Sequence, residues 1–276
     1  MAKFSFIIVE RPDSFVSFDA FTKALRTVKE LGFAGVEFNL TGPSGYEVDA
    51  IARVVESINL PVVSFLTGAN YFSDGLCLSS PSGEVRRKAV ERLQTHAQIA
   101  ARFGAVLVIG QMQGFPSDEP NRAVGEARIE ECLKPVVEAA EKHGSTIAFE
   151  PVNHLQAGFH PTLADVMALA ARLGSTRFKP MLDTFHMNIE EKSMIEPINR
   201  EGSGLAHFHL CESNGSFLGS GHFEVKRIIA ALDQTGYAGY VSVKVYRQPW
   251  MVAAPATMQF LTKLEESGLN TTSTSA

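Results

Sequence analysis

The sequence predicts a single (β/α)₈ (TIM) barrel, and three observations lead to that prediction. Short β-rich runs alternate with amphipathic helical patterns along the chain, eight such runs are present, and 276 residues suit eight strand–helix units. A doubly wound open sheet that binds a cofactor is less consistent with the sequence, because no glycine-rich loop follows the first run. The β-rich runs span residues 4–9, 35–40, 61–66, 105–110, 145–150, 178–183, 206–210 and 240–245.

The segments between these runs carry apolar residues at spacings of three and four, which is the pattern of an amphipathic helix. Thr162 and Asp165 form a capping-box signature ahead of one of them. We expect His96, which falls on a helix, to be solvated. We also expect the strand at 178–183 to pair only beyond Pro180, because proline lacks a backbone donor. Helices are predicted over residues 18–31, 82–103, 129–143, 162–173 and 225–232, and a glycine follows each.

Composition excludes several classes of function. The formal net charge of −5 provides no basic surface for nucleic acid or an anionic membrane. The three cysteines are widely spaced and match no zinc or redox motif, so we expect a reducing, cytoplasmic location. No low-complexity linker divides the chain. We therefore expect one catalytic domain over residues 1–268 and a short, polar, disordered tail over 269–276.

Polar side chains gather at the carboxyl ends of the last four predicted strands. Chemistry in a barrel of this kind is placed at those ends. Two carboxylates and an imidazole there suit a divalent cation of the Mn²⁺, Mg²⁺, Co²⁺ or Zn²⁺ type. The side chains concerned are Glu150, Asp183 with His186 just beyond it, His207 and His209, and Lys244.

Several motifs make a resemblance specific. The segments "MLDTFHMNIEE", "EPVN" and "HFHLCESN", with the later "GSGHF", resemble the xylose-isomerase-like sugar isomerases and epimerases. The closest resemblance is to ketose 3-epimerases of the D-tagatose and D-psicose type. It implies a small sugar or keto-sugar substrate, a bound Mn²⁺, Co²⁺ or Mg²⁺ ion, and assembly into dimers or tetramers.

The resemblance also implies roles for individual residues. Glu150, Asp183 and His209 match three metal ligands of the family, and His186 matches a histidine that contacts substrate. The fourth ligand, a glutamate that also moves protons, falls on position 244, where this chain has lysine. In the family, one glutamate removes a proton from carbon and the other delivers one to the opposite face of an enediolate. Glu150 and Lys244 thus occupy the two proton-transfer positions.

Other positions depart from the family pattern or stay open. His154-Leu155-Gln156 stands where relatives commonly have Arg-Phe-Glu, and Asn214-Gly215 where they have Asn-Arg, so the groups expected to grip sugar oxygens differ. We place His154 with the candidate substrate-binding residues. Glu37 either reaches substrate or makes a structural hydrogen bond. Trp250 either lines the sugar pocket or lies in a subunit contact.

Lys244 changes the charge of the predicted centre. Glu150, Asp183 and an ammonium sum to −1, as three carboxylates and M²⁺ do, so the sequence predicts weakened or lost metal binding and impaired epimerase activity. A metal site that survives with the lysine turned outward is the alternative. Two other functions remain open on the same barrel: a metal-free sugar-binding pseudoenzyme, and a keto-polyol dehydratase or lyase that uses Glu150 alone.

Overall fold

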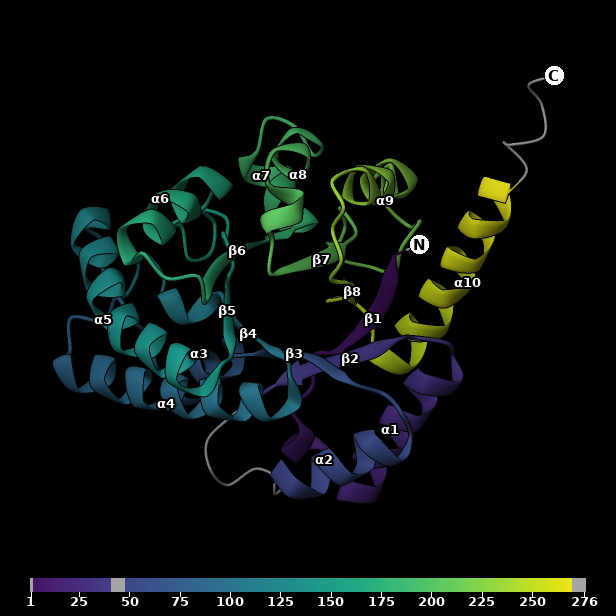
Figure 1. Ribbon diagram of the computed structural model, residues 1–276, viewed down its shortest axis with the longest axis horizontal. Coiled ribbons are helices and arrows are strands. Elements are labelled where there is room, and N and C mark those ends of the chain that lie inside the picture. Colours follow the sequence, from purple (N-terminus) through teal and green to yellow (C-terminus); the bar gives the residue numbers. More distant parts are fainter. Residues whose placement is uncertain (1, 41–47, 270–276) are drawn as a thin grey trace.

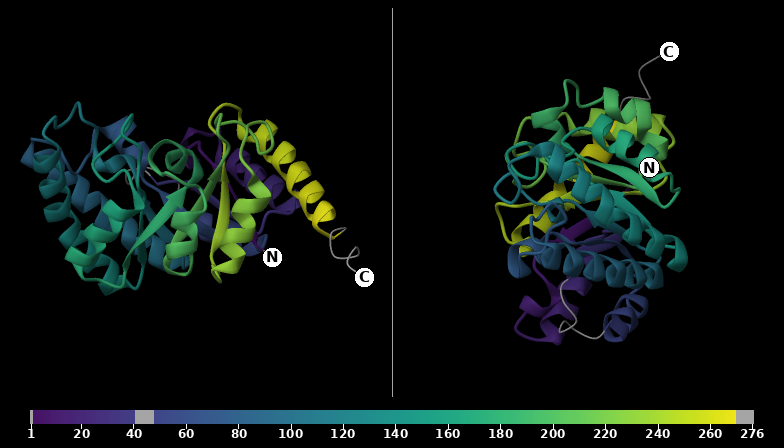
Figure 2. Two further views of the ribbon diagram at one scale, coloured as in Figure 1. Left: turned by 90° about the horizontal axis from the view of Figure 1, so that it is seen from above. Right: turned by 90° about the vertical axis from the view of Figure 1, so that its left-hand side faces the viewer.

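The computed structural model describes residues 2–40 and 48–269. Within them, eight parallel strands pair in chain order and close on one another, β1 to β2 through β8 and back to β1. Figure 1 shows the strands at the centre with the helices outside them, and Figure 2 shows the same elements from two further sides. The predicted (β/α)₈ barrel is confirmed.

The eight strands lie within one or two residues of the predicted runs. They are β1 (Lys3–Ile8), β2 (Gly35–Asn39), β3 (Val62–Leu66), β4 (Val106–Ile109), β5 (Thr146–Phe149), β6 (Phe178–Asp183), β7 (His207–Cys211) and β8 (Tyr240–Lys244). The helices are α1 (Phe18–Glu30), α2 (Val48–Ser57), α3 (Gly68–Asp74), α4 (Gly83–Phe103), α5 (Arg122–His143), α6 (Leu163–Leu173), α7 (Thr184–Glu190), α8 (Glu196–Glu201), α9 (Val225–Gln234) and α10 (Trp250–Leu269). The final helix runs to Leu269, and the rest of the predicted tail lies outside the described residues.

Strand alternation separates two environments. Because successive side chains on a strand point to opposite faces, one set packs under the helices and the other fills the barrel. On β8, Val241 and Val243 belong to the main apolar core. Ser242 hydrogen-bonds to Ser5 of β1 inside the barrel. Lys244 has the same parity as Ser242, so it also points inward.

The interior of the barrel holds both apolar and ionic side chains. A small cluster of strand residues, distinct from the main core, fills part of it: Ile7, Leu66, Val108, Ala148 and Met181. The inward positions near the carboxyl ends of β5 to β8 are polar instead. The strand register sets Asp183 beside His209 and places Lys244 one inward-facing position further along, beside Cys211.

Two expectations from the sequence are wrong. β6 pairs with β5 at and before Pro180, and only its pairing with β7 begins beyond it. The Pro180 carbonyl accepts from Ala206 N, which lies just before β7. Because the nitrogen and carbonyl of one strand residue point to the same neighbour, the Pro180 nitrogen also faces the β7 side. No strand hydrogen bond from Pro180 is needed there, since β7 has not yet begun. His96 is 1% exposed, because it lies on the buried face of α4 with Leu93, Ala97 and Ala100.

None of the helices in the described part of the chain is both long and apolar enough to cross a bilayer.

Candidate functional site

The carboxyl ends of β5, β6 and β8 bring two acids and one lysine into contact. Lys244 Nζ lies 3.1 Å from Asp183 Oδ2 and 3.4 Å from Glu150 Oε1. Lys244 is only 7% exposed, and both acids are more deeply buried. Its ammonium also lies 5.1 Å from the centre of the Tyr246 ring, a cation–π contact. The lysine therefore points between the two carboxylates and not outward into solvent.

The charges in this Lys244 cluster stabilise one another. Burial alone would lower the pKa of Lys244, but the negative charges around it, with Glu150 the strongest, raise that pKa well above its ordinary value. Burial alone would raise the pKa of Glu150 and of Asp183, yet the charge of Lys244 brings both below their ordinary values. The resting state is an ion pair, with an ammonium and two carboxylates.

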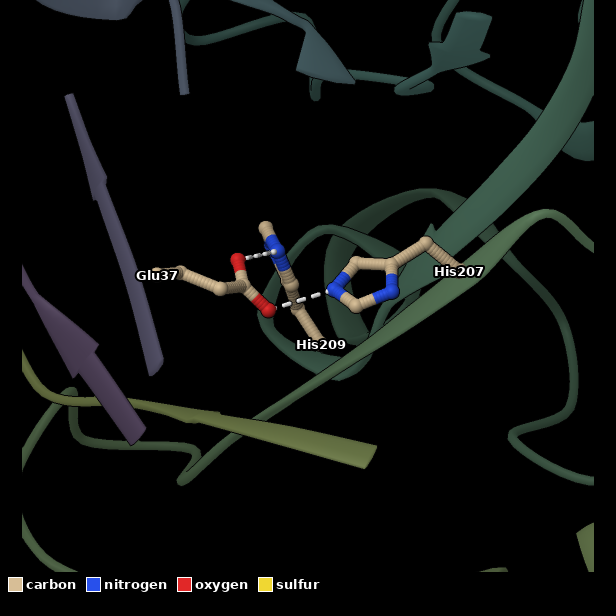
Figure 3. A group of neighbouring side chains, drawn as sticks. All are labelled: Glu37, His207 and His209. Carbon is tan, nitrogen blue, oxygen red and sulfur yellow. Dashed lines mark hydrogen bonds and ion pairs between the residues drawn. The ribbon is translucent and has the colours of Figure 1, made fainter. Parts of the chain in front are cut away.

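A second buried cluster lies beside the first and contacts it through one of its residues, His209. Figure 3 shows the Glu37 carboxylate reaching the rings of both His207 and His209. Glu37 Oε1 lies 2.6 Å from His207 Nε2, and Glu37 Oε2 lies 3.1 Å from His209 Nε2. Glu37 comes from β2, across the barrel from β7, and all three residues are buried. We call this the Glu37 cluster.

The chemistry of the Glu37 cluster fixes which nitrogens carry protons. Burial alone would raise the pKa of Glu37, but the adjacent His207 and His209 lower it well below its ordinary value, so the carboxylate is ionised. An ionised carboxylate only accepts hydrogen bonds, and both rings must therefore donate through Nε2.

The other nitrogen of His209 faces the Lys244 cluster. Its Nδ1 lies 3.5 Å from Glu150 Oε1 and 3.6 Å from Asp183 Oδ2. Burial alone would lower the pKa of His209, but the charge of Glu37 and the adjacent carboxylates of Asp183 and Glu150 raise it to about 10. At neutral pH, Nδ1 therefore carries a proton and faces the two acids.

His186, just beyond β6, presents a nitrogen to the same centre. Asn153 donates its side-chain amide to His186 Nδ1 at 2.7 Å, and Asn153 Oδ1 is taken by Leu155 N, which fixes the amide orientation. His186 Nε2 then carries the proton and lies 3.7 Å from Glu150 Oε1. Neither His186 Nε2 nor His209 Nδ1 has a partner within hydrogen-bond distance. Two buried ring nitrogens therefore face one point with hydrogen-bonding capacity to spare.

Glu150 is held in place by residues that the sequence did not single out. Gln113 donates to the Glu150 backbone carbonyl at 2.9 Å. Gly110, at the end of β4, lies against the Glu150 carboxylate, and a side chain at that position would overlap Glu150 Oε2. The absence of a side chain at 110 thus leaves the space in which the acid sits.

The remaining candidate residues lie away from the Lys244 cluster. His154 is exposed, and its backbone N–H and ring Nδ1 both lie 2.6 Å from Glu190 Oε1. Trp250 begins α10 and lines a cavity of about 450 Å³ with Tyr246, Arg247 and Gln248, just beyond β8. Glu37 makes the structural contacts described above, and both its oxygens are used in them.

Two groups of side chains in the described ranges have the composition of a metal site. Glu150, Asp183 and His186 form one, and Glu37, His207 and His209 form the other, with ligand atoms within 4.8 Å of one another in each group. Carboxylate and imidazole sets of this kind suit Mn²⁺, Co²⁺ or Zn²⁺.

The profile of the xylose isomerase-like TIM barrel family matches residues 25–264. The chain is a member of the xylose isomerase-like TIM barrel family. This membership confirms the resemblance that the motifs carried.

Characterised relatives of this family member include ketose epimerases. An L-ribulose 3-epimerase of Mesorhizobium japonicum is 28% identical over 227 residues, 81% of this chain and 75% of the relative. A D-psicose 3-epimerase of Agrobacterium fabrum is 33% identical over 173 residues, 61% of this chain and 60% of the relative. A 3-keto-D-glucoside 4-epimerase of E. coli superposes with a TM-score of 0.79 at 19% identity, covering 96% of this chain and 100% of the other. At that identity the superposition shows the fold alone.

Proposed function

We propose that this chain binds a free ketose or a close keto-sugar at the carboxyl end of its barrel, and that it is an epimerase-type protein in which Lys244 replaces the metal ion. The sugar-epimerase relatives support the ligand class. The two unpartnered ring nitrogens of His186 and His209 support the location, because hydroxyl and keto oxygens of a sugar would satisfy both.

The observation that carries the proposal is the position of the Lys244 amine. It lies within 3.4 Å of both acids, so the space between the carboxylates already holds a cation. Two unit charges about 4 Å apart interact by roughly 4 kcal/mol at an effective dielectric near 20. A divalent ion beside the ammonium would be repelled by roughly twice that amount, about 8 kcal/mol. The centre with Lys244 in this position does not fit a divalent metal, and metal affinity falls by orders of magnitude.

The same contacts limit what Glu150 can do as a base. Its pKa is lowered by the adjacent ammonium, which makes it a poor acceptor for a proton on carbon. Epimerisation also needs a second group that exchanges protons on the opposite face of the sugar, and Lys244 is held as an ammonium by two acids. Weak or absent epimerase activity is the expected result for the chain as it stands.

The test is Lys244→Glu, which adds a ligand and a base at one position. Mn²⁺ binding would be measured by calorimetry, and turnover by following epimer formation from a panel of ketopentoses and ketohexoses. We expect metal binding and epimerase activity to arise together in Lys244→Glu. The matched control is Lys244→Gln, which removes the charge without restoring the carboxylate and should gain neither at a comparable level.

Two outcomes would contradict the proposal. If the Lys244→Glu variant bound Mn²⁺ no better than the unmodified chain, the amine would not be the group that excludes the ion. An unmodified chain that epimerises ketoses in the presence of Mn²⁺, and loses that activity in EDTA, would show that the metal site is intact.

A sugar-binding protein without turnover is the second candidate, favoured by the same saturated ion pair. It predicts that ketoses raise the melting temperature in EDTA while no deuterium enters the sugar from D₂O. Slow deuterium incorporation at carbon under those conditions would instead show that Glu150 still removes a proton.

A further inference from the structure

The two buried clusters contain three acids. Among the contacts of the described residues, Glu150 and Asp183 contact Lys244 and Glu37 does not. Both of its oxygens are engaged, one by each ring of the Glu37 cluster, and the residue has no exposed surface. A carboxylate in this state has no free oxygen to offer a sugar hydroxyl. Its effect on the candidate centre must therefore pass through a neighbour.

We propose that Glu37 is a positioning residue that, together with His207, sets the orientation of the His209 ring at the candidate centre. His207 holds one carboxylate oxygen, so the other is aimed at His209 Nε2 (Figure 3). The two ring nitrogens lie on opposite sides of the imidazole. Gripping Nε2 turns Nδ1 toward Glu150 and Asp183.

Burial makes this grip selective. His207 and His209 are 2% and 0% exposed, so water cannot take the place of the carboxylate. A ring turned by 180° would place carbon atoms against Glu37 and leave an ionised, buried oxygen without a partner, which is unfavourable. Glu37 therefore selects one of two ring orientations, the one that presents Nδ1 to the centre.

This arrangement has a defined consequence for a metal-binding form of the chain. A histidine that donates one ring N–H to a carboxylate is a better and better-oriented metal ligand through its other nitrogen, and loss of such a carboxylate typically lowers metal affinity by about 10- to 100-fold. This part of the inference rests on the proposed function, since it uses the Lys244→Glu variant as the metal-binding form.

The first measurement does not depend on metal. Long-range ¹H–¹⁵N spectra of the unmodified protein should show His207 and His209 each with a proton on Nε2, in slow exchange with water. In Glu37→Gln the His209 signals should shift and the Nε2 proton should exchange faster. Glu212→Gln is the matched control: Glu212 is equally buried just after β7, but it accepts from the backbone of Ser213 and Gly219 and should leave the His209 signals unchanged.

The second measurement uses Co²⁺ as the probe, followed by its visible absorption, in the Lys244→Glu background. Adding Glu37→Gln should weaken Co²⁺ binding by about 10- to 100-fold, while adding Glu212→Gln should change it by less than about threefold. His207→Asn is the second variant should Glu37→Gln not fold. It removes the partner that aims the carboxylate and should weaken Co²⁺ binding by a smaller factor.

Unchanged His209 signals in Glu37→Gln, or unchanged Co²⁺ affinity, would overturn the positioning role. The positioning role would also be overturned if the unmodified chain bound Co²⁺ tightly and His207→Asn abolished that binding. Glu37, His207 and His209 would then be a metal site themselves. Failure of Lys244→Glu to bind Co²⁺ would count against the proposed function alone, and the nitrogen spectra would still decide the role of Glu37.

Discussion

The Lys244 cluster and the Glu37 cluster solve the same problem in different ways. Each buries carboxylate charge in the barrel, and each surrounds it with nitrogen donors from β7 or β8. In the Lys244 cluster the donor is the end of a long side chain that packs against Tyr246, whereas in the Glu37 cluster the donors are imidazole rings fixed to one strand. We therefore expect the ammonium of the first cluster to be the more easily replaced of the two, and the second cluster to act as a rigid support.

The largest effect is expected from Lys244→Met. Removing the ammonium leaves Glu150 and Asp183 buried without a counterion, and breaking a buried pair in this way typically costs about 3–5 kcal/mol. Urea unfolding in EDTA should show that loss, and added Mn²⁺ should recover part of it. Lys179→Met, an exposed lysine on β6, should change stability by less than about 0.5 kcal/mol. A loss below about 1 kcal/mol in Lys244→Met would mean that the ion pair does not compensate the acids.

A histidine without a carboxylate partner should behave in the opposite way to His209. His160 is buried, and its Nδ1 lies 3.2 Å from Gln113 Oε1. Burial lowers the pKa of His160 from 6.5 to about 4. The unfolded chain therefore takes up a proton near pH 6.5 and the folded chain only near pH 4. Stability is fully present above pH 6.5 and falls by about 3 kcal/mol as the pH drops toward 4.

The check on this pH dependence is a comparison of unfolding free energies between pH 8 and pH 4 in the unmodified chain and in His160→Asn. The asparagine amide can keep the contact to Gln113 but does not titrate. The difference between the two proteins should shrink steadily as the pH falls. A difference that is independent of pH would show that His160 does not take part.

Glu37→Gln should destabilise the protein by a smaller amount, about 2 kcal/mol, the scale of hydrogen bonds to a charged group. The loss is smaller than for Lys244→Met because the glutamine amide is uncharged and its oxygen can still accept from one ring, so no carboxylate is left buried without a partner. Denaturant unfolding at pH 8 measures it. A cost as large as that of Lys244→Met would contradict the contrast between the two clusters.

The smallest effect is expected at Tyr246, which is 42% exposed above the ammonium. A double-mutant cycle of Tyr246→Leu with Lys244→Met should give a coupling energy of about 0.5–1 kcal/mol, the value of a partly exposed cation–π contact. A coupling energy near zero would mean that the Tyr246 ring does not stabilise the Lys244 ammonium.

The sequence predicted the barrel and the convergence of Glu150, Asp183, His209 and Lys244 because both follow from local rules. Alternation sets which side of a strand a residue faces, and parallel strands bring their carboxyl ends to one level. The Glu37 cluster could not be predicted in this way, since β2 and β7 are not neighbours and only the barrel's diameter sets their distance. Spacing on α4 could have found His96, which follows Ala89 and Leu93 on one buried face.

Loop positions were the least predictable. His154 aligns with a residue expected near substrate, but its side chain pairs with Glu190 at the surface, a contact that depends on the path of the chain after β5. Trp250 lines the cavity beyond β8, a position consistent with either expectation for it. Chain paths of this kind depend on packing between loops, which no periodicity encodes.

Gly110 carries a consequence for engineering. Efforts to redesign a catalytic pocket usually randomise the side chains that line it, and a position with none is easily included among them. At 110 every replacement adds atoms where the Glu150 carboxylate lies, so a library that varies this glycine would displace the acid before any new specificity could be selected. Holding residue 110 constant while positions 247 to 250 are diversified would keep the contacts of Glu150 and Lys244 and alter only the lining of the cavity beyond β8.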